Sequence, residues 1–294
     1  MEFLSGIGAA VAAITCRSVT ELGTKSAARV VDSRVIFTLH WMVPALLLSP
    51  ITIILIPWPS VTIQGDFWWI LSVDAPLTVL GSYLFIRSFQ LSDASLVAPF
   101  SLLTPILLLG TSCLMLGESI PPLGIVGVLA VLVGSYQVAR TAPGEFRGTG
   151  YRTLLKDAGV RSMTGAAVIW SVTSNLDKMG VAASSPLVWS VAISWTMFAA
   201  GLLMLLTLRA DKMTSQVWRA VIPGIASTGT IVFQMWALTI LPVAYVITLK
   251  RFSTIITVVA AKVMFGEEVG GRLLGSSIAF LGVLVVVLQL YLAR

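Results

Sequence analysis

Apolar residues in this chain gather in long runs, and short polar or turn-forming stretches separate one run from the next. A helix needs about 20 mostly apolar residues to cross the hydrocarbon core of a bilayer. Runs of that length recur along the whole chain and predict ten membrane-spanning helices. They are expected at residues 4–24, 34–56, 67–90, 95–116, 121–140, 160–183, 186–208, 217–240, 243–265 and 271–292.

Turn-forming sequences support these boundaries, as in PWPS at 57–60 and SDAS at 92–95. The longest polar connection follows the fifth run, and no stretch indicates a separate domain outside the membrane. The chain is therefore expected to divide into a five-helix unit at 1–140, a linking loop at 141–159 and a second five-helix unit at 160–294.

Composition agrees with an all-α, polytopic membrane protein. Hydrophobic residues make up 57% of the chain and charged residues 11%, whereas a soluble domain carries about 25% charged residues. The net charge of +6 is scattered over the loops, so nucleic acid is not an expected partner. One histidine, two cysteines inside apolar runs and no nucleotide-binding motif give no reason to expect a metal, a cofactor or a catalytic site. The expected partners are a small-molecule substrate and the lipid bilayer, with no obligatory protein partner.

Basic residues collect on one side of the predicted membrane. Fourteen of the 19 lysines and arginines follow odd-numbered runs, one lies at the other face and four lie within runs. Short cytoplasmic loops are enriched in Lys and Arg, so this bias predicts that both termini lie outside the cell. We expect an integral, multi-pass protein, in the cell (inner) membrane if the source is prokaryotic.

Short motifs recur in the two halves. GAAV at 8–11 returns as GAAV at 165–168, and the Gly-Glu pair at 117–118 returns at 266–267. Each half has five runs, and this odd number means that the second half enters the membrane upside down relative to the first. Inverted repeats of this kind are shared by many secondary transporters.

These features resemble the drug/metabolite transporter superfamily, and within it the EamA-type permeases. The resemblance rests on 94-ASLVAPFSLLTPILLLGTSCLMLGE-118, on its counterpart ending 264-MFGEE-268, and on 166-AAVIWSVTSNLDKMG-180 with Trp170 and Lys178. It covers nearly the whole chain. It implies a ten-helix bundle around a central cavity, lined chiefly by spans one, three, four, six, eight and nine, that moves small metabolites. It also implies cytoplasmic termini, which differs from the prediction drawn from charge.

Charged residues inside the predicted spans are the strongest site candidates. Lys250 and Arg251 lie together near the middle of the ninth span, where each cation costs about 2.5–3.5 kcal/mol to insert. Lys178, Asp74 and Asp177 are expected in the same half of the bilayer. Helical spacing also places a polar stripe beside each lysine, formed by Ser253, Thr254 and Thr257 next to Lys250 and by Ser171, Ser174 and Asn175 next to Lys178.

Two hypotheses explain these charges. The cations could bind a substrate carboxylate or phosphate, or Lys178 or Arg251 could form an internal ion-pair network with Asp74 and Asp177. Either aspartate could also carry a coupled proton. A Lys-Arg pair at this place resembles the triose-phosphate translocators, where the pair contacts substrate phosphate.

Weaker candidates complete the predicted site. Arg17 and Glu21 stand four residues apart and are expected to pair, with a role in proton coupling as a further hypothesis. Aromatic residues could form a wall against the substrate or simply pack, and these are Trp170, Trp236 and Tyr245. The remaining binding candidates are Asn175, Gln234 and Tyr83.

Two further predictions concern structure rather than binding. His40 and Trp41 on the second span are predicted to pack within the bundle. Pro99 and Pro105 are predicted to loosen the hydrogen bonding of the fourth span and to provide a hinge.

The leading functional hypothesis is a secondary transporter, a permease or an exporter or exchanger, that moves a small anionic or zwitterionic metabolite such as an amino acid by alternating access. One alternative is an organic-phosphate exchanger resembling triose-phosphate translocators. An alternative of another class is a lipid-flipping or structural membrane subunit. An enzyme is not expected, because the spans hold no catalytic set such as Ser with His or paired aspartates.

Overall fold

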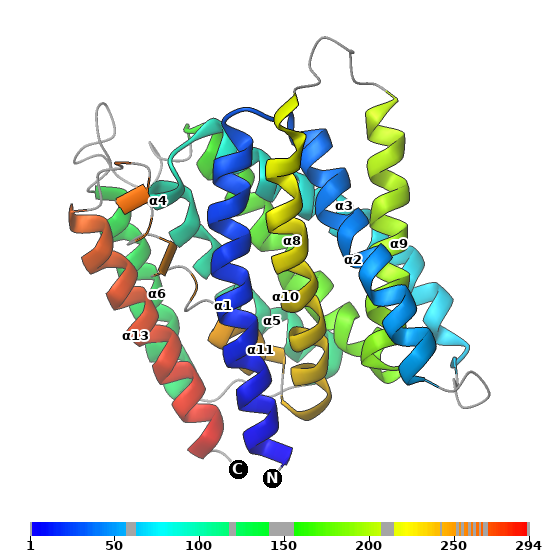
Figure 1. Cartoon of the computed structure of the whole chain (residues 1–294). Helices are drawn as coiled ribbons and strands as arrows, with labels where there is room; N and C mark the ends of the chain where they lie inside the picture. Colours follow the sequence, from blue (N-terminus) through cyan, green and yellow to red (C-terminus); the bar gives the residue numbers. More distant parts are fainter. Residues whose placement is uncertain are drawn as a thin grey trace.

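The computed structural model describes residues 2–56, 63–117, 122–140, 156–206, 215–241, 243–250, 253, 256–257, 260, 263–264, 266 and 270–292. Within these ranges the chain is helical and contains no strand (Figure 1). The helices of the first half are α1 (Glu2–Ala28), α2 (Ser33–Leu55), α3 (Asp66–Leu91), α4 (Ala94–Val97), the 3-10 helix η2 (Ala98–Leu102), α5 (Leu103–Leu116) and α6 (Pro122–Arg140). The helices of the second half are α8 (Ala158–Ala182), α9 (Pro186–Leu205), the 3-10 helix η5 (Ser215–Ala220), α10 (Val221–Ile240), α11 (Val243–Lys250) and α13 (Gly270–Leu292).

These helices lie where the apolar runs predict them. The expected spans at 34–56, 67–90 and 271–292 correspond to α2, α3 and α13, with ends that differ by at most one residue. The ninth span is described as α11 and at scattered positions beyond it. The all-α, ten-span prediction is therefore confirmed over the part of the chain that the structure describes.

The fourth span is not a continuous α-helix. The α-helical turn of α4 gives way to η2 at Ala98, and regular α-helix resumes at Leu103. Pro99 stands at the start of η2, and a proline cannot donate the backbone hydrogen bond that continues a helix. The change of helix type agrees with the prediction for Pro99, whereas Pro105 stands in the first turn of the regular helix α5.

The repeated Gly-Glu motifs share a local structure at their glycines. Gly117 follows α5 with a φ of 68°, and Gly266 follows the described residues of the ninth span with a φ of 67°. A left-handed residue commonly ends a helix, and glycine adopts this conformation without a steric penalty. The sequence echo therefore corresponds to the same kind of turn in both halves.

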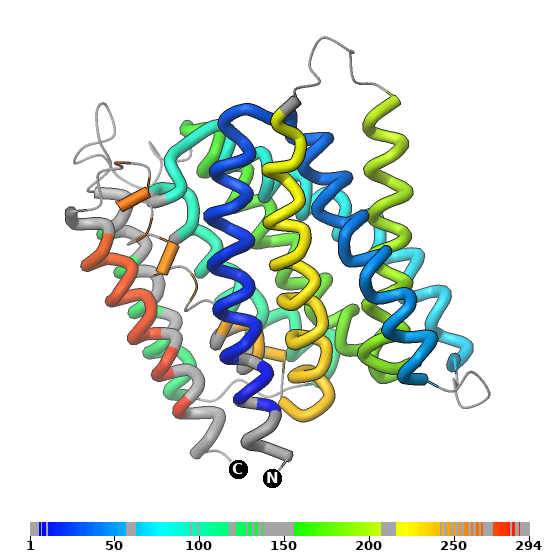
Figure 2. Tube along the Cα trace, in the orientation of Figure 1, coloured from blue at the N-terminus to red at the C-terminus, as the bar shows by residue number. Residues whose placement is uncertain are grey.

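Helix packing relates the two halves as partners of a pseudo-twofold. α1 packs most extensively against α10 and α3 against α8, while α2 packs against α9 and α6 against α13. The first span of each half therefore packs against the third span of the other half, the two second spans pack together, and the two fifth spans pack together. Exchanging the halves leaves this set of pairs unchanged. The equivalent helices α2 and α9 run in opposite directions, and the two ends of the chain lie at the same end of the bundle (Figures 1 and 2). The repeats are therefore inverted.

Small residues let α6 and α13 approach closely. A Cβ atom added at Gly134 would lie 2.3 Å from the backbone nitrogen of Ala279 and 2.5 Å from the carbonyl oxygen of Gly275. Small residues commonly permit such contacts between membrane helices. This packing places Gly275 at a close helix contact.

The outer surface is apolar. Side chains such as Ile54, Leu114 and Leu206 are at least 80% exposed, and such a surface suits contact with hydrocarbon. Four helices in the described part are long and apolar enough to cross a membrane, namely Ser33–Leu55, Asp66–Leu91, Pro186–Leu205 and Gln216–Ile240. α1 and α8 instead carry charged residues that face inward, including Arg17, Glu21 and Asp177.

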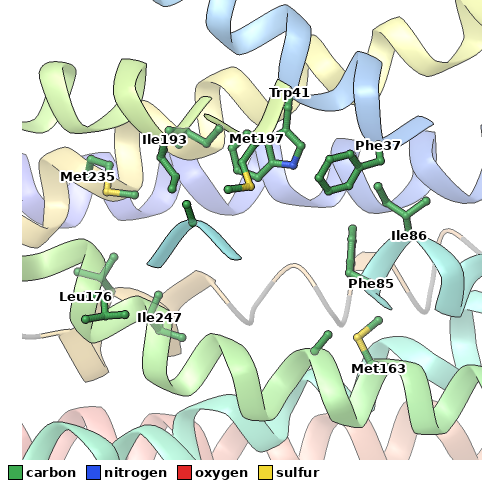
Figure 3. Close-up of a cluster of buried hydrophobic side chains, with 14 of the residues drawn as sticks. Phe37, Trp41, Phe85, Ile86, Met163, Leu176, Ile193, Met197, Met235 and Ile247 are labelled. Carbon is green, nitrogen blue, oxygen red and sulfur yellow. The ribbon is translucent and has the colours of Figure 1, made fainter. Parts of the chain in front are cut away.

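A buried apolar cluster joins both halves around the centre of the bundle. Its members include Trp41 of α2, Phe85 of α3, Leu176 of α8, Ile193 of α9 and Met235 of α10 (Figure 3). Contributions from both repeats place the core, and the cavity described next, between them.

Candidate functional site

A central cavity lies between the two repeats. Water-sized molecules have about 100 Å³ of room in it, within about 860 Å³ of space between protein atoms that includes open solvent. Its described lining comes from α1, α2, α3, α8, α9, α10 and α11. The family resemblance implied a contribution from the fourth span, but no described residue of that span lines the cavity, whereas α2 contributes His40 and Trp41.

Arg17 and Glu21 form a buried ion pair on α1, as their spacing predicts. Arg17 Nε donates to Glu21 Oε1 at 2.9 Å, and the two side chains are 10% and 2% exposed. Glu21 also accepts hydrogen bonds from Ser253 Oγ, at 3.4 Å, and from Thr257 Oγ1. The carboxylate of Glu21 thus connects Arg17 to Ser253 and Thr257 of the ninth span, which are both buried, while Thr254 lies outside the described residues.

Two aromatic rings hold the guanidinium group of Arg17. Its Cζ atom lies 4.3 Å from the centroid of the Phe85 ring and 5.0 Å from that of the Trp170 ring. The two rings themselves are 5.3 Å apart between centroids. Cation–π contact of this kind is stronger where water is excluded. Trp170, a predicted binding residue, therefore lines the cavity beside Arg17.

A second charged group lies where α8, α10 and α11 meet the cavity. Lys250 Nζ donates to Gln234 Oε1, and both side chains line the cavity. Asp177 lines it too and accepts a hydrogen bond from Trp189 Nε1 at 2.8 Å. Lys250 lies close enough to Asp177 to interact with it electrostatically. The cavity therefore contains a cation and an anion from the second half in addition to Arg17.

Asp74 lies beside this group but outside the cavity lining. Its side chain is fully buried on α3, and it accepts a hydrogen bond from Thr78 Oγ1 at 3.3 Å. It interacts electrostatically with Asp177 on α8. The two aspartates that the sequence singled out thus belong to neighbouring helices of the two halves.

Other predicted site residues lie away from the described lining. Asn175 is fully buried, and its Nδ2 donates to Thr111 Oγ1 and to the Ser171 carbonyl, so it ties α8 to α5. Trp236 is 55% exposed on the outer surface. Tyr83 is half-buried against the core, and Lys178 does not line the cavity.

Arg251 and the side chain of Tyr245 lie outside the described residues. The structure therefore places Lys250, Gln234, Trp170, Asp177 and Arg17 around one cavity. It does not bring Lys178, Asn175, Tyr83 or Trp236 into the lining that it describes.

His40 and Trp41 were predicted to pack within the bundle, and both also line the cavity. Hydroxyl groups of α10 line it as well, from Ser227 and Thr230. The polar His-Trp pair within an otherwise apolar span could have indicated that α2 lines the cavity. The serines and threonines of α10 could not have indicated this, because such residues often bond to their own helix, as Thr230 does to the Ala226 carbonyl.

Polar contacts join both halves at the end of the bundle where α1 finishes. Lys25 Nζ donates to the carbonyl oxygens of Phe89, at 3.2 Å, and Ser92, at 2.7 Å. Ser92 Oγ donates to Asp157 Oδ1 at 2.6 Å, and Asp157 also caps the first turn of α8. α1, α3 and α8 are therefore held together at this end.

Comparison with known proteins agrees with this architecture. The sequence description of the EamA-like transporter family matches residues 4–140 and again residues 158–288. A comparison with curated proteins finds no match. Among solved structures, 28 chains match. One of them, described only as a crystal structure of a protein, is 18% identical, with a TM-score of 0.70 over 99% of each chain.

The structural likeness shows the fold, and the two matches of the family description cover most of the chain. Together with the apolar helices, they show an integral, multi-pass membrane protein made of two repeats. This chain belongs to the EamA-like transporter family, whose members are membrane transporters of the drug/metabolite type.

Proposed function

We propose that this protein is a secondary transporter that moves a small anionic or zwitterionic metabolite, such as an amino acid, by alternating access. The observation that carries the proposal is the central cavity, which combines charged, hydroxyl and aromatic side chains from both repeats. Intramembrane charges that face such a cavity commonly mark a substrate pathway.

The mixed charge of the cavity supports a small polar substrate. Arg17 and Lys250 offer positive charge and Asp177 offers negative charge, while Trp41, Phe85 and Trp170 provide apolar contact. A molecule that carries a carboxylate and an ammonium group can meet both signs of charge in one cavity. A lipid-flipping subunit would instead require a long apolar path beside the polar one.

Alternating access requires the two repeats to move relative to each other. We propose that residues 1–140 and 160–294 are the moving units, linked by 141–159. The hydrogen bond from Ser92 to Asp157 would close one entrance, and it would break when α8 moves away from α1 and α3, whereas the Lys25 bonds lie within the first repeat and would persist. The charge bias of the loops supports a cytoplasmic position for that entrance and an outside position for both termini, whereas the family resemblance implies cytoplasmic termini.

An uptake screen with purified protein in proteoliposomes tests the proposal. The compounds are labelled amino acids, glycerol 3-phosphate and a nucleotide sugar, with protein-free vesicles as the control. Saturable uptake of an amino acid or another small anion, reduced in Lys250→Ala and in Arg251→Ala, is the expected result. No saturable uptake of any compound would contradict the proposal, and uptake of glycerol 3-phosphate alone would favour the organic-phosphate exchanger. Cysteine labelling within 141–159 would give the orientation.

A further inference from the structure

We infer that the substrate presents a carboxylate, and that Arg17, His40 and Trp41 bind it. The inference rests on the proposed function, because it concerns the same cavity. It differs from the hypothesis drawn from the sequence, which placed the anion on Lys250 and Arg251. It also gives His40 and Trp41 a role beyond packing.

Three buried polar atoms of the cavity lining lack a hydrogen-bond partner within the described part of the chain. They are Arg17 Nη2, His40 Nδ1 and Trp41 Nε1, and their residues are only 7–8% exposed. Buried polar groups almost always have a partner, and leaving one without a partner is costly. The other buried atoms without a partner among the described residues lie outside this lining. Acceptor oxygens of a bound ligand would satisfy the N–H groups of Arg17 and Trp41, and they would satisfy His40 in the tautomer whose Nδ1 carries the proton.

The three residues lie together on α1 and α2. Arg17 is close enough to His40 for an electrostatic interaction. The rings of His40 and Trp41 meet edge to face, with centroids 5.6 Å apart. Trp41 belongs to the same buried cluster as Phe85, whose ring contacts the Arg17 guanidinium (Figure 3). His40 and Trp41 are therefore adjacent, and Arg17 lines the same cavity within electrostatic reach of His40.

Arg17 is held in place before any ligand binds. Its Nε is bonded to Glu21, and its faces lie against Phe85 and Trp170. These contacts fix the plane of the guanidinium group and leave Nη2 for another acceptor. A fixed donor loses less conformational entropy on binding than a flexible one, which favours affinity.

The local charge favours a carboxylate over a phosphate. The carboxylate of Glu21 already offsets the charge of Arg17. A phosphate monoester would bring up to two negative charges into this membrane-buried part of the cavity, where unbalanced charge is costly. A carboxylate brings one charge and two acceptor oxygens, which match the guanidinium and indole N–H donors. Asp177 in the same cavity is the described carboxylate that an ammonium group of the substrate would approach.

The sharpest test removes one donor and no charge. Trp41→Phe deletes the indole N–H, and Trp195→Phe is the matched control, because Trp195 Nε1 donates to Ser49 Oγ outside the cavity lining. Full-length variants are compared in proteoliposomes for uptake of the labelled amino acids and glycerol 3-phosphate. We expect uptake of a carboxylate, with a KM that rises about tenfold to a hundredfold in Trp41→Phe. The control is expected to keep the wild-type KM, and the amide of the transported amino acid is expected not to compete.

A second variant tests the cation without leaving an unpaired charge. Arg17→Gln combined with Glu21→Gln keeps the pair neutral, and its folding is checked by size-exclusion chromatography and thermal unfolding. We expect this folded variant to lose uptake at least about tenfold at low substrate concentration. The inference would be overturned if Trp41→Phe and the double variant both kept the wild-type KM. Transport of glycerol 3-phosphate but of no carboxylate would also overturn it. Both outcomes leave the proposed transport function standing. Failure of the wild-type protein to transport any compound would overturn the proposed function, and the inference with it.

Discussion

The buried pair of Arg17 and Glu21 gives a prediction about stability that does not depend on the substrate. Glu21→Gln keeps the shape of the side chain but leaves the Arg17 guanidinium without a counter-charge at a site that is 8% exposed. Breaking a buried ion pair by removing one partner typically costs about 3–5 kcal/mol. Glu21→Gln also weakens the acceptor for Ser253 and Thr257 of the ninth span. We therefore expect destabilisation of about 3 kcal/mol or more.

A double-mutant cycle isolates the pair. Glu21→Gln, Arg17→Gln and the double variant are unfolded in detergent, and intrinsic tryptophan fluorescence follows the free energy of unfolding. Asp66→Asn is the control, because Asp66 is an exposed carboxylate at the start of α3. The double variant should be more stable than the sum of the single effects by at least about 1 kcal/mol, because it leaves no lone charge. Single effects that add within about 0.5 kcal/mol would refute the reasoning.

Three further changes test other parts of the structure. Gly134→Ala should lower the thermal stability by separating α6 from α13, at a cost of about 1–3 kcal/mol. Gly110→Ala is the control and should be neutral or stabilising, because a Cβ atom there meets open space. Equal melting temperatures of the two variants would contradict this packing. Ser92→Ala should weaken the closed end of the bundle by removing the hydrogen bond to Asp157. A thiol introduced by Ser174→Cys should then be labelled faster from that side. An unchanged labelling rate would show that this hydrogen bond does not keep the entrance closed. Trp189→Phe removes the N–H that donates to Asp177 and should lower uptake more than Trp195→Phe does. Equal uptake in the two variants would exclude a role in transport for the hydrogen bond to Asp177.

The fold was largely predictable because membrane helices must satisfy their own backbone hydrogen bonds and therefore need long apolar runs. The turn glycines Gly117 and Gly266 marked the repeat for a similar local reason. The pairing of α1 with α10 and of α3 with α8 was not predictable in the same way. Apolar side chains are interchangeable at a helix contact, so their order along one helix does not identify the helix that packs against it.

The site was predicted only in part. Lys250, Asp177 and Arg17, which line the cavity, were singled out because a charge inside an apolar run is costly and needs an environment that accepts it. Helical spacing gives the face of one helix, however, and not the neighbour that this face meets. For this reason Lys178 and Asn175 were grouped with the binding residues, although the structure places neither in the described lining, and His40 and Trp41 were assigned to packing alone.

The most direct test of the central cavity as the substrate site uses one introduced thiol. Ser174 lines the cavity on α8, and Ser174→Cys is made after Cys16→Ala and Cys113→Ala remove the native thiols. A membrane-permeant methanethiosulfonate reagent is applied to proteoliposomes with and without the transported compound. We predict that labelling abolishes uptake and that the compound slows labelling in proportion to its occupancy. Full labelling with undiminished uptake, at a rate that the compound does not change, would contradict a substrate site in this cavity.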